Sequence, residues 1–241
     1  MTFNFTNRQE YQREIQTDFF QYSVSFEYAN LFIQTETDLS ELAQRALKKY
    51  YMQIRDFAQK FPEFEYSLVP VEIPYPVPKI VKDMLTASGA AETGPFSAVA
   101  GAVSEYVGRE LLKYSGEVFV ENGGDIFLCS KDYCTVAIYA GDSPLSMKAG
   151  IIMPPGSFGI CTSAGRLGHS LSFGNAHAAV CVSQNTALAD SCATLLGNSV
   201  KTPEDITGAL NTVCGIGGII GAVCIIDGHI GFSGDIEITK L

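Results

Sequence analysis

The sequence predicts an α+β fold in which two similar halves each combine a helix with antiparallel strands, with a site between the halves. Two observations lead to this prediction. A helical pattern followed by a hairpin pattern occurs around residues 97–128 and again around 188–238, and both copies carry a late Gly-Asp-Ile. The Asn-Gly at 122–123 and the Asp-Gly at 227–228 stand between apolar runs, which is a strong hairpin signal. The alternative to an internal repeat is chance resemblance between two common hairpins.

Length and composition bound the architecture. The chain has 241 residues, of which 46% are hydrophobic, enough for a substantial core. No uninterrupted apolar run approaches the roughly 18 residues of a membrane span. We therefore expect a single domain over residues 1–241, with a possible internal boundary in the proline-rich connector at 62–78.

Charge and cysteine usage restrict the partners. The formal net charge is -10 and the 16 basic residues are dispersed, which argues against nucleic acid, because a phosphate-binding face needs clustered Lys and Arg. The N-terminus has no basic stretch followed by an apolar one, so we expect a cytoplasmic protein without a membrane partner. The 7 cysteines form no close CxxC pair, and we expect buried, reduced thiols; a catalytic or metal-bound cysteine is the alternative.

The first part of the chain predicts strands, a long helix and a connector. Residues 12–34 alternate loosely between apolar and polar, which predicts one or two strands with one buried face. A helix with apolar residues at helical spacing begins near Ser40, with Asp38 or Ser40 as its cap. Pro62 should end this helix, and four prolines in 64–78 predict an extended surface connector.

The remaining elements follow from periodicity and turn residues. Small residues on one side of the helix that begins at Ser97 permit close packing, or close approach of a ligand to its N-terminus. The strand at 133–139 is expected to complete the group formed by the hairpin before it. Further helices are expected at 79–91, at 186–196 and from Thr202 onward, and further strands at 147–155, at 178–183 and in a last hairpin over 221–238.

Asp190 and Thr194 are the first candidates for chemistry. They stand four residues apart on a predicted helix, so their side chains share one face. A carboxylate and a hydroxyl together form a partial ligand set for Mg²⁺, which prefers oxygen and keeps sites for water or phosphate. In the alternative interpretation, Asp190 is a charge near a helix start and Thr194 belongs to the core.

The segment Asn122-Gly123-Gly124-Asp125 is the second candidate. Its backbone N–H groups could bind a phosphate, and its carboxylate could bind a ring or a sugar. A plain hairpin turn explains the first three residues, but not the acid that follows on an otherwise apolar strand.

A glycine-rich stretch contributes Thr162, Ser163, His169 and Ser170. Histidine is the natural proton acceptor near neutral pH, and Ser163 or Ser170 could bind phosphate. The sequence has no Gly-x-Ser-x-Gly motif, which disfavours a serine hydrolase, and neither a Walker loop nor a dinucleotide-binding glycine motif.

Taken in order, these segments resemble the ApbE-type flavin transferases, and more closely an uncharacterised group of small cytoplasmic relatives of those enzymes. The likeness covers roughly residues 90–200. The segments that carry it are Gly94-Pro-Phe-Ser-Ala-Val-Ala-Gly-Ala, Glu121-Asn-Gly-Gly-Asp-Ile, Cys161-Thr-Ser-Ala-Gly, Gly168-His-Ser and Leu188-Ala-Asp-Ser-Cys-Ala-Thr.

The resemblance implies a function. In the transferase family, FAD and Mg²⁺ bind, and FMN moves to a Ser or Thr of an acceptor protein with release of AMP. Asp190 and Thr194 match the metal-binding pair of that family, and residues 122–125 match its loop at the flavin nucleotide. His169 matches the histidine after the Thr-Ser-Gly loop.

The same resemblance assigns the other candidates. His169 or Asp125 would deprotonate the incoming hydroxyl, and Thr162, Ser163 and Ser170 would contact the nucleotide. Where the family has His-x-x-Asp-Pro, this chain has His169-Ser-Leu-Ser-Phe, so an acid is replaced by Ser172. This replacement keeps open the alternative of a non-catalytic protein that binds a flavin or another nucleotide. The sequence also leaves a homodimer open.

Overall fold

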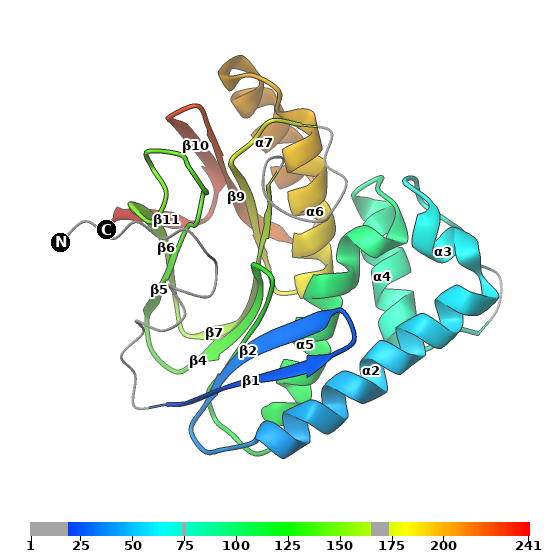
Figure 1. Cartoon of the computed structure of the whole chain (residues 1–241). Coiled ribbons are helices and arrows are strands. Elements are labelled where there is room, and N and C mark those ends of the chain that lie inside the picture. The colour runs from blue at the N-terminus through cyan, green and yellow to red at the C-terminus, as the bar shows by residue number, and fades with distance from the viewer. Residues whose placement is uncertain (1–18, 74–75, 165–173) are drawn as a thin grey trace.

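The computed structural model describes residues 19–73, 76–164 and 174–241 of the chain. An eight-stranded antiparallel sheet lies between a layer of helices and a smaller three-stranded sheet (Figure 1). The large sheet has the order β1 (Phe20–Phe26), β2 (Ala29–Thr35), β3 (Val118–Asn122), β4 (Asp125–Ser130), β7 (Gly156–Ser163), β8 (Ala178–Ser183), β9 (Ile219–Ile226) and β10 (His229–Gly234). The small sheet has the order β11 (Glu237–Lys240), β6 (Ala149–Met153) and β5 (Cys134–Ala137).

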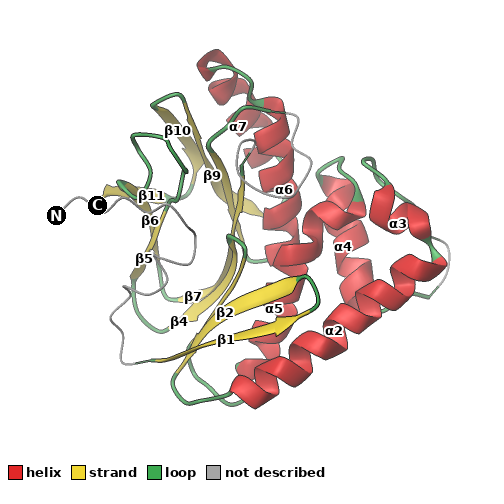
Figure 2. Cartoon of the chain, viewed as in Figure 1, coloured by secondary structure: helices red, strands yellow, loops and turns green. Residues whose placement is uncertain are grey.

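The helices gather on one face of the large sheet (Figure 2). They are α2 (Ser40–Lys60), α3 (Pro62–Tyr66), α4 (Lys79–Ala90), α5 (Val99–Leu111), α6 (Thr186–Ser199) and α7 (Ile206–Cys214), with short 3-10 turns η1 (Pro95–Ala98) and η2 (Pro203–Asp205). Among the described residues, none of the helices has the length and apolar character that a membrane crossing requires.

The predicted α+β fold is confirmed, and so is the recurrence of helix and hairpin. In the first half α5 precedes the β3–β4 hairpin, and in the second half α6 and α7 precede the β9–β10 hairpin. The halves join where β4 pairs with β7, in a register that places Asp125 opposite Cys161. Asp125 and the end of β7 therefore lie where the two halves join.

Two hydrophobic clusters cover the two faces of the large sheet. Successive strand residues point to opposite faces, so one strand contributes to both clusters. On β8, Ala179 and Cys181 belong to the helix-side cluster, whereas Val180 and Val182 belong to the cluster under the small sheet. Every residue of β8 is buried, because the helices cover one face of this strand and the small sheet covers the other. This explains why its sequence is apolar almost without interruption.

The structure corrects three details of the sequence prediction. The strand at 134–137 does not join the β3–β4 group but pairs with β6 in the small sheet. Helix α2 ends before Pro62 as predicted, but the expected extended connector begins with the short helix α3, where Pro62 is the first residue and its missing N–H costs nothing. The cap position of α2 is Leu39, without a side-chain capping bond, although Asp38 Oδ1 accepts a hydrogen bond of 2.9 Å from the Ser40 N–H.

Candidate functional site

Helices α5 and α6 approach each other closely, because small residues lie where they meet. A Cβ added at Gly101 would lie 2.5 Å from the carbonyl oxygen of Thr186 and 2.8 Å from the Asp190 Cβ. Any larger residue at position 101 would therefore push the helices apart. The small-residue face predicted for this helix serves close packing against α6.

Each of these two helices caps the other with a carboxylate. The Gly101 N–H, in the first turn of α5, donates to Asp190 Oδ2 at 2.8 Å. The Thr186 N–H, at the start of α6, donates to Glu105 Oε2 at 2.7 Å. Helix N-termini carry unpaired N–H groups and a positive partial charge, so both carboxylates are well placed. This reciprocal arrangement fixes the position of Asp190 relative to α5.

A cavity of about 440 Å³ lies at the N-terminal end of α5. Asp190 and Thr194, one helical turn apart on α6, both line it, as their spacing predicted. Asp125 at the start of β4 and Ser163 at the end of β7 line the same cavity. We call it the acidic cavity. The rest of its lining includes Glu65, Thr93, Ser97, Ala100 and Asn198.

Two aspartates give the acidic cavity its electrostatic character. Asp190 is only 8% exposed, and burial raises its pKa well above the usual range. The negative charge of Asp125 raises this pKa further, while the N–H groups of Gly101 and Ala100 lower it in part. Asp125 Oδ1 accepts a hydrogen bond of 3.3 Å from the Thr162 N–H. No lysine or arginine lines this cavity in the described parts of the chain, so the cavity favours a cation.

The glycine hairpin joins the same turn of α5. Gly123 and Gly124 adopt φ values of 67° and 109°, which side chains resist, so the turn needs glycine. Asn122 Nδ2 donates to the Ala100 carbonyl oxygen at 3.2 Å. The first turn of α5 is therefore hydrogen-bonded to both motifs, to Asn122 through the Ala100 carbonyl oxygen and to Asp190 through the Gly101 N–H. The two strongest motifs of the sequence meet here.

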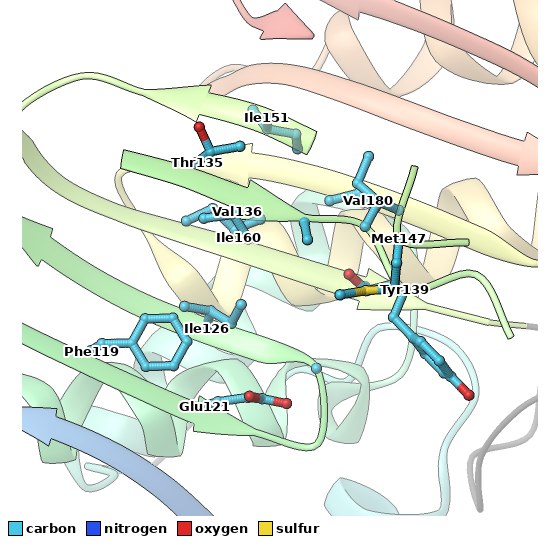
Figure 3. A pocket seen from close by; sticks show the side chains of 14 residues that line it. Phe119, Glu121, Ile126, Thr135, Val136, Tyr139, Met147, Ile151, Ile160 and Val180 are labelled. Carbon is cyan, nitrogen blue, oxygen red and sulfur yellow. The ribbon is translucent and has the colours of Figure 1, made fainter. Parts of the chain in front are cut away.

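The structure divides the other predicted residues among three cavities. A cavity between the two sheets, the inter-sheet cavity, is shown in Figure 3. Thr162, the neighbour of Ser163, lines it together with Gly124. Asn122 lines a third cavity of about 410 Å³ beside Tyr51 and Phe96. Thr162 and Ser163 line different cavities because they are consecutive residues of β7, and successive residues of a strand point to opposite faces of the sheet. The residues that the resemblance assigns to the nucleotide therefore line different cavities.

His169 and Ser170 lie outside the described residues, so their predicted roles stay predictions. All 7 cysteines are free thiols. Burial raises the pKa of Cys161 and of Cys181, which keeps both thiols neutral. Among the described residues, no group of three or more His, Cys, Asp or Glu side chains could hold a metal ion.

Sequence reasoning missed a chain of hydroxyl groups beside Asp190. Thr93 Oγ1 lies 2.7 Å from Ser97 Oγ, which lies 2.9 Å from Ser191 Oγ. Thr93 and Ser97 line the acidic cavity. Ser97 and Ser191 are 94 positions apart, so no local pattern links them. The only feature of the sequence that pointed to this group of hydroxyls was the density of small residues around Gly94.

Comparisons with known proteins agree with this architecture. A family model described as AbpE bacteria matches residues 12–214. A UPF0280 protein from Methanosarcina acetivorans is 37% identical over 204 residues, which cover 83% of this chain and 81% of that protein. A UPF0280 protein from Methanococcus maripaludis strain C6 is 34% identical over 226 residues, which cover 90% and 92%.

Solved structures share the fold at much lower identity. The flavinyl transferase ApbE of Pseudomonas stutzeri, in its apo form, aligns with a TM-score of 0.59 and 13% identity over 89% of this chain and 94% of that one. The flavin transferase ApbE of Vibrio cholerae aligns with a TM-score of 0.57 and 13% identity over 89% and 96%. At identity this low, the alignments show a shared fold only. The family match and the UPF0280 relatives together show that the chain belongs to the AbpE bacteria family.

Proposed function

We propose that the chain is a magnesium-dependent enzyme that cleaves the pyrophosphate of FAD and transfers FMN to a Ser or Thr of an acceptor protein. One observation carries the proposal. Asp190 and Thr194 line the acidic cavity together with Asp125, and the glycine hairpin is anchored to the same turn of α5. The fold shared with two flavin transferases of known structure supports it.

The donor groups fit a hard divalent cation. Asp190 and Thr194 would hold Mg²⁺ through oxygen, with the Asp125 carboxylate lining the same cavity. Mg²⁺ keeps several waters in most protein sites, so a few protein oxygens suffice. The bound ion would neutralise charge on the pyrophosphate. Asp190 can cap α5 and bind a cation together, because a carboxylate has two oxygens with about four acceptor positions.

The cavity beside Asn122 offers a place for a ring system. Glu65, Phe96, Val99 and Ala100 line both this cavity and the acidic one, so the two are adjacent. Tyr28, Tyr51 and Phe96 supply aromatic surface for a planar ring. Each cavity falls within the range of about 300–1,000 Å³ typical of small-molecule sites. Together they provide an apolar end and a polar end, as a dinucleotide requires.

The transfer would proceed by displacement at phosphorus. The acceptor hydroxyl oxygen forms a bond to the phosphorus of the FMN half, the bond from this phosphorus to the bridging oxygen breaks, and AMP leaves with that oxygen. The proton of the hydroxyl passes to a base. Asp125, oriented by the Thr162 N–H, and His169 are the candidates.

A turnover assay tests the proposal. Purified full-length chain is incubated with FAD and Mg²⁺, and the products are separated by chromatography. We expect AMP and FMN, with water as a slow acceptor, and at least about a hundredfold loss in Asp190→Asn. Thr194→Val should lose more activity than Thr194→Ser, which keeps the hydroxyl. If wild type forms neither product, catalysis is excluded.

The alternative is a protein that binds a flavin or another nucleotide without turnover. Ser172, which stands where the transferases have an acid, favours it. The same assay separates the two functions when it is combined with a binding measurement. Magnesium-dependent FAD binding without AMP would select the alternative, and absence of binding would contradict both.

A further inference from the structure

A cavity of about 290 Å³ lies between the large sheet and β5 of the small sheet, next to the inter-sheet cavity. The two cavities share Phe119, Thr135 and Val136, whose side chains are labelled in Figure 3. Gln34 on β2 lines only the first of them, and we call that one the amide cavity. Among the described residues, none lines both the amide cavity and the acidic cavity, so the two are separate.

The side-chain amide of Gln34 is buried without a partner for its N–H groups. Gln34 is only 8% exposed, and its Nε2 has no hydrogen-bond partner in the part of the chain that the structure describes. The pairing of β2 with β3 places Gln34 opposite Phe119, whereas its neighbour Ile33 belongs to the helix-side cluster. The amide therefore lies on the face that the small sheet covers. Native proteins pair nearly all buried polar groups, so an unpaired donor in a cavity wall requires an explanation.

The other polar groups of the amide cavity restrict the charge of a ligand. Ser130 Oγ donates to Glu117 Oε2 at 3.0 Å, and the Lys131 N–H donates to the same oxygen at 2.8 Å. The hydroxyl proton of Ser130 is therefore used within the protein, and a carboxylate stands beside the cavity. No lysine or arginine side chain lines the cavity within the described ranges. An anion would be repelled there, so the surroundings favour a neutral acceptor.

The remaining lining is apolar or weakly polar. Phe119 and Leu128 supply carbon surface, and Cys134 supplies a thiol. Burial raises the pKa of Cys134, and the charge of Glu117 raises it further, so this thiol stays neutral. Ligand sites typically combine such an apolar lining with a few polar groups that orient the ligand. Here the Gln34 amide is the polar group that is available.

We propose that the amide cavity binds a small neutral carbonyl compound, with its apolar body between the sheets and its oxygen on Gln34 Nε2. The volume of about 290 Å³ lies at the lower end of the range of about 300–1,000 Å³ typical of ligand pockets, which restricts the ligand to a small molecule. The bound oxygen would give the buried amide the partner that it lacks. This site does not depend on the function proposed above.

Ligand titrations followed by NMR test this site with two probes. Acetophenone carries a carbonyl oxygen, whereas toluene has an aromatic ring and no acceptor. We expect acetophenone to bind wild type at millimolar concentration. Gln34→Met keeps the length of the side chain but has no N–H group, so it should weaken acetophenone about fivefold, the effect of one lost hydrogen bond. Toluene should bind wild type and Gln34→Met equally. Cys134→Phe, which fills the cavity, should weaken both probes.

Gln53→Met is the matched control, because it makes the same change within α2, in the helix layer. It should leave the binding of acetophenone as in wild type. Without ligand, Gln34→Met should be at least as stable to thermal unfolding as wild type, because it removes an unpaired buried donor. A clear loss of stability would show that the amide is already satisfied, and would overturn the proposal.

Three binding results would overturn it as well. They are absence of acetophenone binding at millimolar concentration, equal binding of acetophenone to wild type and Gln34→Met, and undiminished binding to folded Cys134→Phe. Thermal unfolding establishes that each variant is folded. Should Cys134→Phe fail to fold, the comparison of Gln34→Met with wild type still decides.

Discussion

The two faces of the large sheet are built from the same strands but have different chemistry. On the helix side, Asp125 and Ser163 face α6 and share a cavity with Asp190. On the other side, Glu121 and Thr162 face the small sheet, across mainly apolar side chains. Neighbouring residues therefore line different cavities. The hairpin at 122–125 joins β3 to β4 and reaches both cavities, because Gly124 lines the inter-sheet cavity and Asp125 lines the acidic cavity.

The strongest test of this comparison separates α5 from α6. Gly101→Ala places a methyl group 2.5 Å from the Thr186 carbonyl oxygen and 2.8 Å from the Asp190 Cβ, so the helices must shift. We expect a loss of about 1–3 kcal/mol in the free energy of unfolding, together with loss of the proposed FAD cleavage. Chemical denaturation and the turnover assay measure the two effects.

Gly208→Ala is the control for that variant. Gly208 lies within α7, and an added Cβ meets nothing within 4 Å. Alanine favours helix over glycine, so this variant should be up to about 1 kcal/mol more stable than wild type. Equal stability of Gly101→Ala and Gly208→Ala would contradict the close approach of α5 and α6.

A smaller effect distinguishes the neighbours Thr162 and Ser163. Ser163→Ala removes a hydroxyl from the acidic cavity and should lower FAD cleavage about tenfold, the effect of one lost hydrogen bond of about 1.4 kcal/mol. Thr162→Val changes the inter-sheet cavity instead. Its rate of FAD cleavage should therefore stay at least about fivefold higher than that of Ser163→Ala. Steady-state kinetics measures both. The reverse order would show that the two faces are not separate.

The smallest expected effect lies in the helix layer, away from both cavities. Glu110 accepts hydrogen bonds from Lys113 Nζ and from the Tyr50 hydroxyl, which lower its pKa to about 2. A lowered folded-state pKa stabilises the protein above the usual value of 4.5, and this contribution is lost as the pH falls through about 2.

Glu110→Gln should therefore lower the stability at pH 7 by about 1 kcal/mol or less, and the difference from wild type should shrink as the pH falls from 4.5 toward 2. Denaturant unfolding at several pH values measures this dependence. A difference that grows on acidification would contradict the assigned role of Glu110.

Much of the fold could be predicted from local pattern. The Asn-Gly and Asp-Gly turns predicted the β3–β4 and β9–β10 hairpins, and the spacing of apolar residues predicted the helix α2. The pairing of β5 with β6 could not be predicted, because nothing in a strand sequence identifies its partner. A helix was predicted from Thr202 onward, and in the structure Thr202 forms a capping box with Asp205.

The candidate site was predicted in part. The spacing of Asp190 and Thr194 placed both on one face, and the structure brings them to the same cavity as Asp125. The reciprocal capping by Glu105 and Asp190 depends on how two helices pack, which no local pattern encodes. The inter-sheet cavity was not expected either, because it depends on the position of the small sheet.

Calorimetric titration with FAD, with and without Mg²⁺, tests the central claim most directly. The claim is that Asp190 and Thr194 form a cation-dependent nucleotide site on the helix side of the sheet. The account predicts Mg²⁺-dependent binding to wild type, loss of this dependence in Asp190→Asn, and its retention in the matched acid-to-amide variant Glu110→Gln. Mg²⁺-dependent binding of equal strength in wild type and Asp190→Asn would contradict the account.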